Sequence, residues 1–143
     1  MAKIKWQEAT YLKCEISVSP QSSPKYKFIC IDDDGNEFEI TAPEFSFDVA
    51  VGSGGNILRS GNEIRRVGRT SINWSQGRVN YIGNTSIHWS NGKLSRIGNT
   101  SINWSGDRIT YIGNTSIGWI CGNICRVGRA SISSNGDISG SVK

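Results

Sequence analysis

Apolar residues recur with a fixed period of fifteen along residues 67–141. Each copy begins with an apolar anchor followed by glycine, and the anchors are Val67, Ile82, Ile97, Ile112 and Val127. Five and seven residues after the anchor, the first four copies carry an isoleucine and a tryptophan: Ile72 and Trp74, Ile87 and Trp89, Ile102 and Trp104, Ile117 and Trp119. A short period without insertions indicates a repeat array whose equivalent residues share equivalent environments.

Each copy contains two short segments in which polar and apolar residues alternate. In the copy that starts at Ile82, these segments are residues 85–89 and 93–96, separated by Ser90-Asn91-Gly92. Alternation with period two is typical of a strand with one buried face. Gly98-Asn99 leads into the next copy, and both residue types tolerate the positive φ of tight turns. The pattern predicts an all-β array of strand-turn-strand-turn units.

Two architectures fit these units. In a β-solenoid or β-roll, each unit is one coil, and residue i stacks on residue i+15 at about 4.8 Å. In an antiparallel meander, each unit is one hairpin that pairs Trp89 with Leu94 and Ile87 with Arg96. Two-residue loops at both ends give a period of about 14, so a period of fifteen requires one extra residue. We favour the solenoid, because it covers its own apolar face, which we expect a partner of fifty residues to cover only in part.

The residue before each anchor alternates between arginine and tyrosine. This outer row consists of Arg66, Tyr81, Arg96, Tyr111 and Arg126. In a parallel stack the alternation would place each guanidinium against a tyrosine ring, a contact worth about 0.5–1 kcal/mol at an exposed site. A second series carries like charges instead: Arg78, Lys93 and Arg108. The eight residues of the two series are the candidate binding residues.

The first fifty residues predict a smaller β region. Residues 11–18, 27–31, 37–40 and 45–49 alternate in strand fashion, and Asp32-Asp33-Asp34-Gly35-Asn36 is a hairpin signal between two of them. The aspartate run lacks the spaced oxygen ligands of a calcium loop, which favours a solvated hairpin tip.

Charge divides the chain near residue 50. Residues 1–50 carry five Lys and nine Asp or Glu, which gives −4, whereas residues 51–143 carry nine Arg, two Lys and three acids, which gives +8. We therefore expect an acidic cap at 1–51, a flexible join at Gly52-Ser53-Gly54-Gly55, and a basic array at 52–143. The array units start at residues 52, 67, 82, 97, 112 and 127, the first being a worn copy in which Arg59 replaces tryptophan.

Residues that could support catalysis or bind a metal are sparse. His88 is the single histidine, no phosphate-binding loop motif is present, and no nucleophile motif can be matched to it. Cys121 and Cys125 have a C-x3-C spacing that does not match a zinc site, so four reduced thiols are expected. The start of the chain has no apolar signal region, and the longest apolar runs are far below the roughly 20 residues of a membrane span. We expect a cytoplasmic, non-enzymatic protein without metal, cofactor or membrane contact.

Three functions remain open. The first is a rigid module that docks a protein partner with an acidic surface, of the inhibitor, immunity or assembly type, or a second copy of itself. The second is nucleic-acid binding through arginine interleaved with aromatic residues. We expect the tryptophans to belong to the core, since they share the parity of the isoleucines, and this favours the protein partner. The third is ice binding by a threonine series, although corner hydrogen bonding between coils explains that series better: Thr70, Thr85, Thr100 and Thr115.

Overall fold

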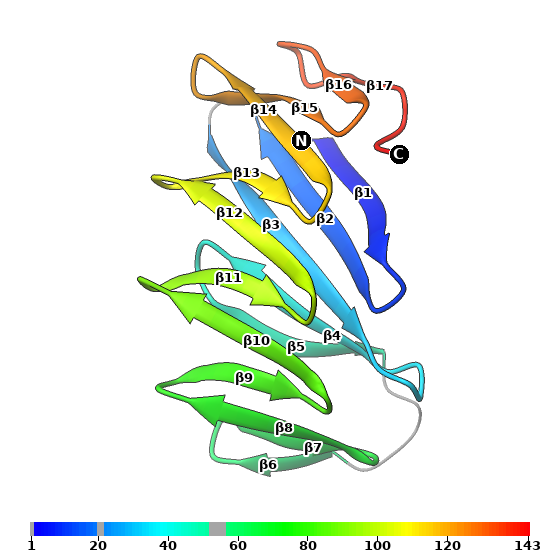
Figure 1. Cartoon of the computed structure of the whole chain (residues 1–143), viewed down its shortest axis with the longest axis vertical. Coiled ribbons are helices and arrows are strands. Elements are labelled where there is room, and N and C mark those ends of the chain that lie inside the picture. Colours follow the sequence, from blue (N-terminus) through cyan, green and yellow to red (C-terminus); the bar gives the residue numbers. More distant parts are fainter. Residues whose placement is uncertain (1, 20–21, 52–56) are drawn as a thin grey trace.

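The protein consists of two antiparallel β-sheets that face each other. The computed structural model describes residues 2–19, 22–51 and 57–143, and these residues form seventeen strands and no helix (Figure 1). The all-β class expected from the alternating pattern is therefore confirmed. The described residues contain no helix long and apolar enough to cross a membrane.

The first sheet contains five strands in chain order: β1 Ala2–Ala9, β2 Leu12–Ser19, β3 Ser22–Ile31, β4 Glu37–Ala42 and β5 Ser46–Val51. β2 to β5 lie close to the segments that alternation predicted. β1 was not predicted as a separate strand, although Ile4 and Trp6 alternate there with lysine and glutamine. The side chains of Ile4, Trp6, Cys14 and Phe28 point to the buried face.

The second sheet is a twelve-stranded meander in which every strand pairs antiparallel with its neighbours in the chain. Its strands are β6 Ile57–Ser60, β7 Glu63–Val67, β8 Thr70–Ser75, β9 Arg78–Ile82, β10 Thr85–Ser90, β11 Lys93–Ile97, β12 Thr100–Ser105, β13 Arg108–Ile112, β14 Thr115–Ile120, β15 Asn123–Val127, β16 Ala130–Ile132 and β17 Ile138–Ser139. The worn copy before residue 67 forms the β6–β7 hairpin with the same pairing as the later copies.

This pairing corrects the favoured solenoid arrangement. A solenoid requires parallel stacking of residue i on residue i+15, whereas β10 runs antiparallel to β9 and to β11. The meander alternative describes these pairs, including Trp89 opposite Leu94. Ile87, however, lies opposite Ile97 rather than Arg96.

A β-bulge in each hairpin explains the period of fifteen. Asn73 pairs with Tyr81 and Trp74 pairs with Val79, so Asn80 is an extra residue without a partner opposite. The same shift occurs at the equivalent residue of the other hairpins: Arg65, Ser95, Thr110 and Cys125. An extra residue restores the side-chain parity that two two-residue loops would otherwise lose. Both Val79 and Ile82 thereby face inward.

The hairpin turns have the backbone that their residues favour. Asn91 and Gly92 have φ of 52° and 79°, so both central residues lie in the left-handed region, as in a type I′ hairpin turn. The link to the next hairpin has a positive φ at its glycine, 57° at Gly98. Asparagine and glycine accept these angles more readily than other residues, which fixes where each strand ends.

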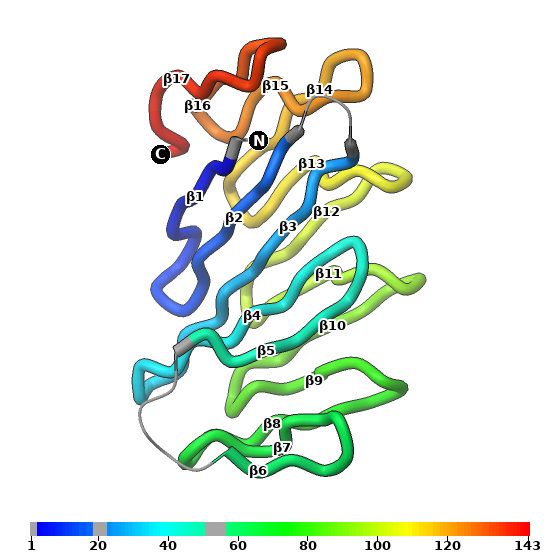
Figure 2. The backbone as a smooth tube through the Cα atoms, turned by 180° about the vertical axis from the view of Figure 1, so that it is seen from behind, coloured from blue at the N-terminus to red at the C-terminus, as the bar shows by residue number. Residues whose placement is uncertain are grey.

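The core lies between the two sheets. Isoleucines of the array and residues such as Phe28 and Phe38 of the first sheet form one buried cluster. Figures 1 and 2 show β1–β5 lying across the array as a second layer. Ile72, Ile87, Ile102 and Ile117 are 1–5% exposed. The first fifty residues therefore cover the apolar face that they were expected to leave partly open.

The change from one sheet to the other falls between β5 and β6. Residues 52–56, which include the predicted flexible join, lie outside the described residues. The acidic segment contributes the five-stranded sheet, and the basic segment contributes the twelve-stranded sheet.

Candidate docking surface

The outer row occupies the face of the array that points away from the first sheet. Tyr81 and Tyr111 are 42% and 47% exposed, and Arg66, Arg96 and Arg126 are exposed as well. Across the sheet, each member of the row pairs with a serine of the following strand, as Tyr81 does with Ser86 and Arg96 does with Ser101. Folding as a meander thus brings all five residues onto one surface.

The strand order sets the spacing along this surface. Neighbouring strands are about 4.8 Å apart, so an arginine and the next tyrosine, two strands away, are separated by about 10 Å across the strands. Successive arginines, four strands apart, are separated by about 19 Å. The expected stacking of guanidinium on tyrosine rings is therefore wrong, because a whole strand lies between the two residues. Nothing in the pairing explains why arginine and tyrosine alternate.

The positive charge of the outer row is not neutralised. No ion pair involves Arg66, Arg96 or Arg126 within the described parts of the chain. The carboxylates of Glu63 and Asp107 pair with Arg65 at 2.6 Å and Lys93 at 3.4 Å. The residues that pair with the row across the sheet are leucine, serine, asparagine, histidine and glycine, and none is acidic.

The tryptophans lie on the opposite face, half-buried against the core. Trp89 Nε1 donates to the carbonyl of Val79 at 2.8 Å, which joins its hairpin to the preceding one. The same bond recurs from Trp74 to Ile64, from Trp104 to Leu94 and from Trp119 to Ile109, at 2.7–2.9 Å. Each acceptor precedes a bulged residue, where the regular strand pairing is interrupted. The indole therefore satisfies a carbonyl that the interrupted ladder leaves without a regular partner.

The like-charge series also lies on this inner side. Arg78 is centred 5.1 Å from the ring of Trp89, Lys93 5.5 Å from that of Trp104, and Arg108 5.1 Å from that of Trp119. The cation–π contacts therefore form between hairpins, with tryptophan as the partner. Phe45 of the first sheet packs edge-on against Trp74 and Trp89, and Tyr26 does so against Trp104. The cation–π contacts join neighbouring hairpins, and the edge-on ring contacts join the array to the first sheet. Of the candidate binding residues, the outer row is therefore the part that remains available to a partner.

Polar residues of the first sheet bind the links between hairpins. We call each link a corner; the corners are residues 68–70, 83–85, 98–100, 113–115 and 128–130. The Tyr11 hydroxyl lies 2.7 Å from Thr100 Oγ1 and accepts from the Asn99 backbone N–H at 3.0 Å. The Glu8 carboxylate accepts from Thr115 Oγ1 and from the Asn114 N–H. Thr100 and Thr115 thus bind the first sheet, whereas bonds between coils were expected.

The aspartate hairpin tip also contacts a corner, so the expected solvated tip is exposed only in part, at Asp33 and Gly35. Thr70 Oγ1 donates to Asp32 at 2.6 Å, and Arg69 pairs with Asp34 at 2.5 Å. Burial would raise the pKa of Asp32, but hydrogen bonds from Thr70, Asn36 and Asp34 lower it overall. Glu8 has the same balance: burial raises its pKa, and several hydrogen bonds, that from Thr115 first among them, bring it below the usual value. Sequence reasoning missed these acceptors, because isolated Glu8 and Tyr11 carry no motif.

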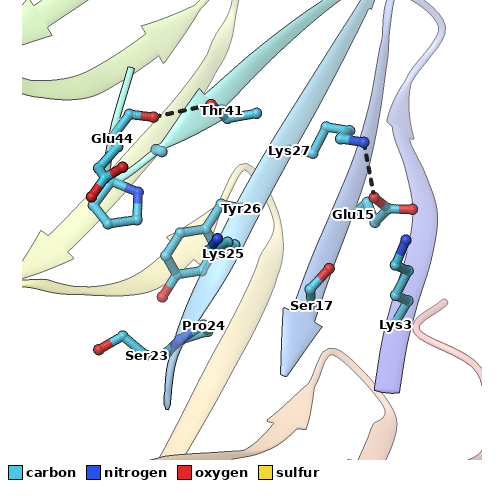
Figure 3. Close-up of a pocket in the computed structure, with 12 residues that line it drawn as sticks. Lys3, Glu15, Ser17, Ser23, Pro24, Lys25, Tyr26, Lys27, Thr41 and Glu44 are labelled. Carbon is cyan, nitrogen blue, oxygen red and sulfur yellow. Dashed lines mark hydrogen bonds and ion pairs between the residues drawn. The ribbon is translucent and has the colours of Figure 1, made fainter. Parts of the chain in front are cut away.

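The outer surface of the first sheet is a weaker candidate. A pocket of about 400 Å³ lies there (Figure 3), and its Glu15 side chain is only 9% exposed. Lys5 and Lys27 approach Glu15 at 3.4 and 3.6 Å and compensate its charge. A ligand would have to displace these internal pairs, whereas the arginines of the outer row have no ion-pair partner among the residues that the structure describes.

The cysteines are free thiols in two settings. Cys14 and Cys30 are buried in the first sheet, and burial raises the pKa of Cys30 to about 12. Cys121 is exposed at the tip of the β14–β15 hairpin, and Cys125 occupies the bulge position of the same hairpin. No cluster of three or more His, Cys, Asp or Glu side chains suited to a metal occurs in the portion of the chain described.

Comparison with known proteins assigns no relative: no family model matches the chain, and neither a curated protein nor a solved structure resembles it significantly.

Proposed function

We propose that this protein is a non-enzymatic docking module whose outer row binds a protein partner with an acidic surface. The observation that carries the proposal is the row itself, in which three arginines that form no ion pair with any described residue alternate with two exposed tyrosines on one face of the sheet. Arginine and tyrosine are, with tryptophan, the residue types enriched among the residues that contribute most to binding at protein interfaces. Charge complementarity therefore specifies the partner: carboxylates spaced to meet guanidinium groups about 19 Å apart.

The position of the tryptophans favours a protein over nucleic acid as the partner. A stacking platform for bases needs exposed aromatic faces at close intervals. Trp74, Trp89, Trp104 and Trp119 pack inward and donate their indole N–H groups to neighbouring hairpins. Among the described residues, only the two tyrosines of the outer row remain as exposed aromatic rings for stacking, and about 19 Å across the strands separates them. Side-chain carboxylates on a folded partner suit this sparse spacing better.

The test compares two triple variants with equal loss of charge. In the first, Arg66, Arg96 and Arg126 are changed to Gln; in the second, Arg59, Arg65 and Arg129, which lie outside the outer row, are changed to Gln. The full-length parent and both variants are used to capture binding species from host extract, with and without nuclease. Any captured protein is then purified, its sequence charge determined, and its Kd measured against all three baits.

The proposal expects an acidic protein that the parent retains after nuclease treatment. The outer-row variant should lose at least about tenfold in affinity, since truncating one central arginine commonly costs 1–2 kcal/mol or more. The matched variant should lose less than about threefold, as rim charges do. Equal losses in both variants, or retention of nucleic acid alone, would refute the proposal. A captured second copy of the chain would instead indicate self-association.

A further inference from the structure

The five corners of the array have one recurring chemistry, and one of them is unfilled. A complete corner offers two donors, the backbone N–H of its second residue and the hydroxyl of its threonine. At 98–100 the Asn99 N–H donates to the Tyr11 hydroxyl, which also shares a hydrogen bond with the Thr100 hydroxyl. At 113–115 both donors meet the Glu8 carboxylate. At 128–130, Ala130 replaces threonine, and the Arg129 N–H donates to the Val142 carbonyl at 2.9 Å. At 68–70, the Thr70 hydroxyl donates to Asp32.

The corner at 83–85 has no such acceptor. Neither the Asn84 N–H nor the Thr85 hydroxyl makes a hydrogen bond to any other described residue of the chain. Thr85 is only half-buried, whereas Thr70, Thr100 and Thr115 are 8%, 6% and 2% exposed. The 83–85 corner thus has the same kinds of donor as the corners at 98–100 and 113–115, but no side chain of the first sheet binds them in the described chain.

The space beside this corner is open as well. A Cβ atom built on Gly83 would meet only a methyl group of Thr70, at 3.4 Å. At Gly98 and Gly113 the same atom would meet the Tyr11 ring at 3.0 Å and the Glu8 carboxylate at 2.7 Å. A cleft of about 750 Å³ lies here, bounded by Tyr11 on one side and the aspartate hairpin on the other. An extended segment of another chain can therefore reach the two donors.

The charges around the cleft select the ligand. Three aspartates, Asp32, Asp33 and Asp34, line it together with the single cation Arg69, so its lining carries a net charge of −2. Arg69 is engaged by Asp34, and Asp32 by Thr70, while the exposed Asp33 forms no ion pair within the described residues. This field disfavours a carboxylate and favours a neutral acceptor on a positively charged molecule. A backbone carbonyl meets the first requirement, as Val142 shows at the last corner.

We propose that the 83–85 corner binds an extended, lysine- or arginine-bearing peptide segment of a partner. The backbone carbonyl of the segment accepts from the Asn84 N–H and the Thr85 hydroxyl, and its basic side chain pairs with Asp33. This site lies along the corner edge of the array and uses none of the residues of the outer row. A negative result for this site would therefore leave the docking function proposed above unaffected, and the reverse also holds.

The test titrates two model peptides into the ¹⁵N-labelled full chain and follows backbone amide resonances. The probes are acetyl-Gly-Lys-Gly-amide and acetyl-Gly-Glu-Gly-amide, which share the same carbonyls and differ in charge. The lysine peptide should shift the Asn84 amide in a saturable way and leave the Asn114 amide unmoved, because the corner of Asn114 is filled by Glu8 and lies outside the cleft. Thr85→Val and Asp33→Asn should each weaken binding about fivefold, the equivalent of one lost hydrogen bond or ion pair.

Unchanged Asn99 and Asn114 resonances in both variants verify that the fold is intact. An Asn84 resonance that neither peptide moves overturns the proposal. So does a glutamate peptide that binds as well as the lysine peptide, or binding of the lysine peptide that neither variant weakens.

Discussion

Glu8 provides the sharpest test of how the two layers are held together. Its side chain is 4% exposed, and it accepts from Trp6 Nε1 at 2.9 Å, from the Asn114 N–H at 3.1 Å, and from Thr115 and Lys143. Replacing Glu8 with alanine leaves four donors without their acceptor at the contact between β1 and the corner at 113–115.

The magnitude follows from those contacts. A hydrogen bond to a charged group contributes about 1.5–3 kcal/mol, and removing one partner of a buried charged network costs about 3–5 kcal/mol. Lys143 is half exposed and contributes little. Loss of the carboxylate also removes its own desolvation cost, so we expect the lower end, about 3 kcal/mol. With a urea m value of about 2 kcal/mol/M, the unfolding midpoint should fall by about 1.5 M.

The assay is urea unfolding at pH 7 followed by tryptophan emission, since the indoles lie at contacts that unfolding breaks. Glu39→Ala is the matched control, because Glu39 pairs with Lys27 at 3.7 Å on the solvent side of the first sheet. Its midpoint should move by less than about 0.5 M, as expected for an exposed pair. If Glu8→Ala shifts the midpoint no more than the control does, the corner contacts do not hold the layers together.

Three further outcomes follow from the same contacts. Because its folded pKa is lowered, Glu8 contributes stability above its unfolded pKa of about 4.3, which is lost as the pH falls through the folded value; Glu8→Gln should flatten the acid limb of a midpoint-against-pH profile, and an unchanged limb contradicts this. Trp89→Phe removes the donor to the Val79 carbonyl and should cost about 1–3 kcal/mol in urea unfolding, so a neutral result would show that water replaces the indole. Cys121 should react with a disulfide reagent at pH 8 well before Cys30, whose pKa burial raises to about 12; mapping by mass spectrometry would contradict this if both thiols reacted together.

The sequence predicts the elements of this fold better than their pairing. The alternation of Ile and Trp with polar residues identifies the strands, and Asn91-Gly92 identifies a hairpin turn. The period of fifteen was ambiguous because its extra residue could lie in a turn, in a coil or in a strand. It lies in the strand, at Asn80 and its equivalents, and a bulge has no composition signal at these positions, which are occupied by Arg, Asn, Ser, Thr and Cys.

The candidate surface was predictable for a related reason. Arg66 and Tyr81 occupy equivalent positions, so any regular array places them on one face, whichever way its strands run. The contacts between layers were not predictable, because Glu8, Tyr11 and Asp32 occur once each and bind residues 38 to 107 positions away. Single residues that meet only after two sheets pack leave no periodic trace in the chain.

The anchoring of the corners limits how this protein can change in length. Whole hairpins could be gained or lost by duplication without altering which side chains face inward. However, Asp32, Tyr11 and Glu8 bind corners at fixed intervals along the array. A hairpin inserted between two of these corners would move the later corner two strands away from the side chain that binds it. The β6 end escapes this constraint, because all four of its side chains are exposed. The first sheet thus fixes the number of hairpins between the corners that Asp32 and Glu8 bind, whereas an additional hairpin at the β6 end would displace none of these contacts.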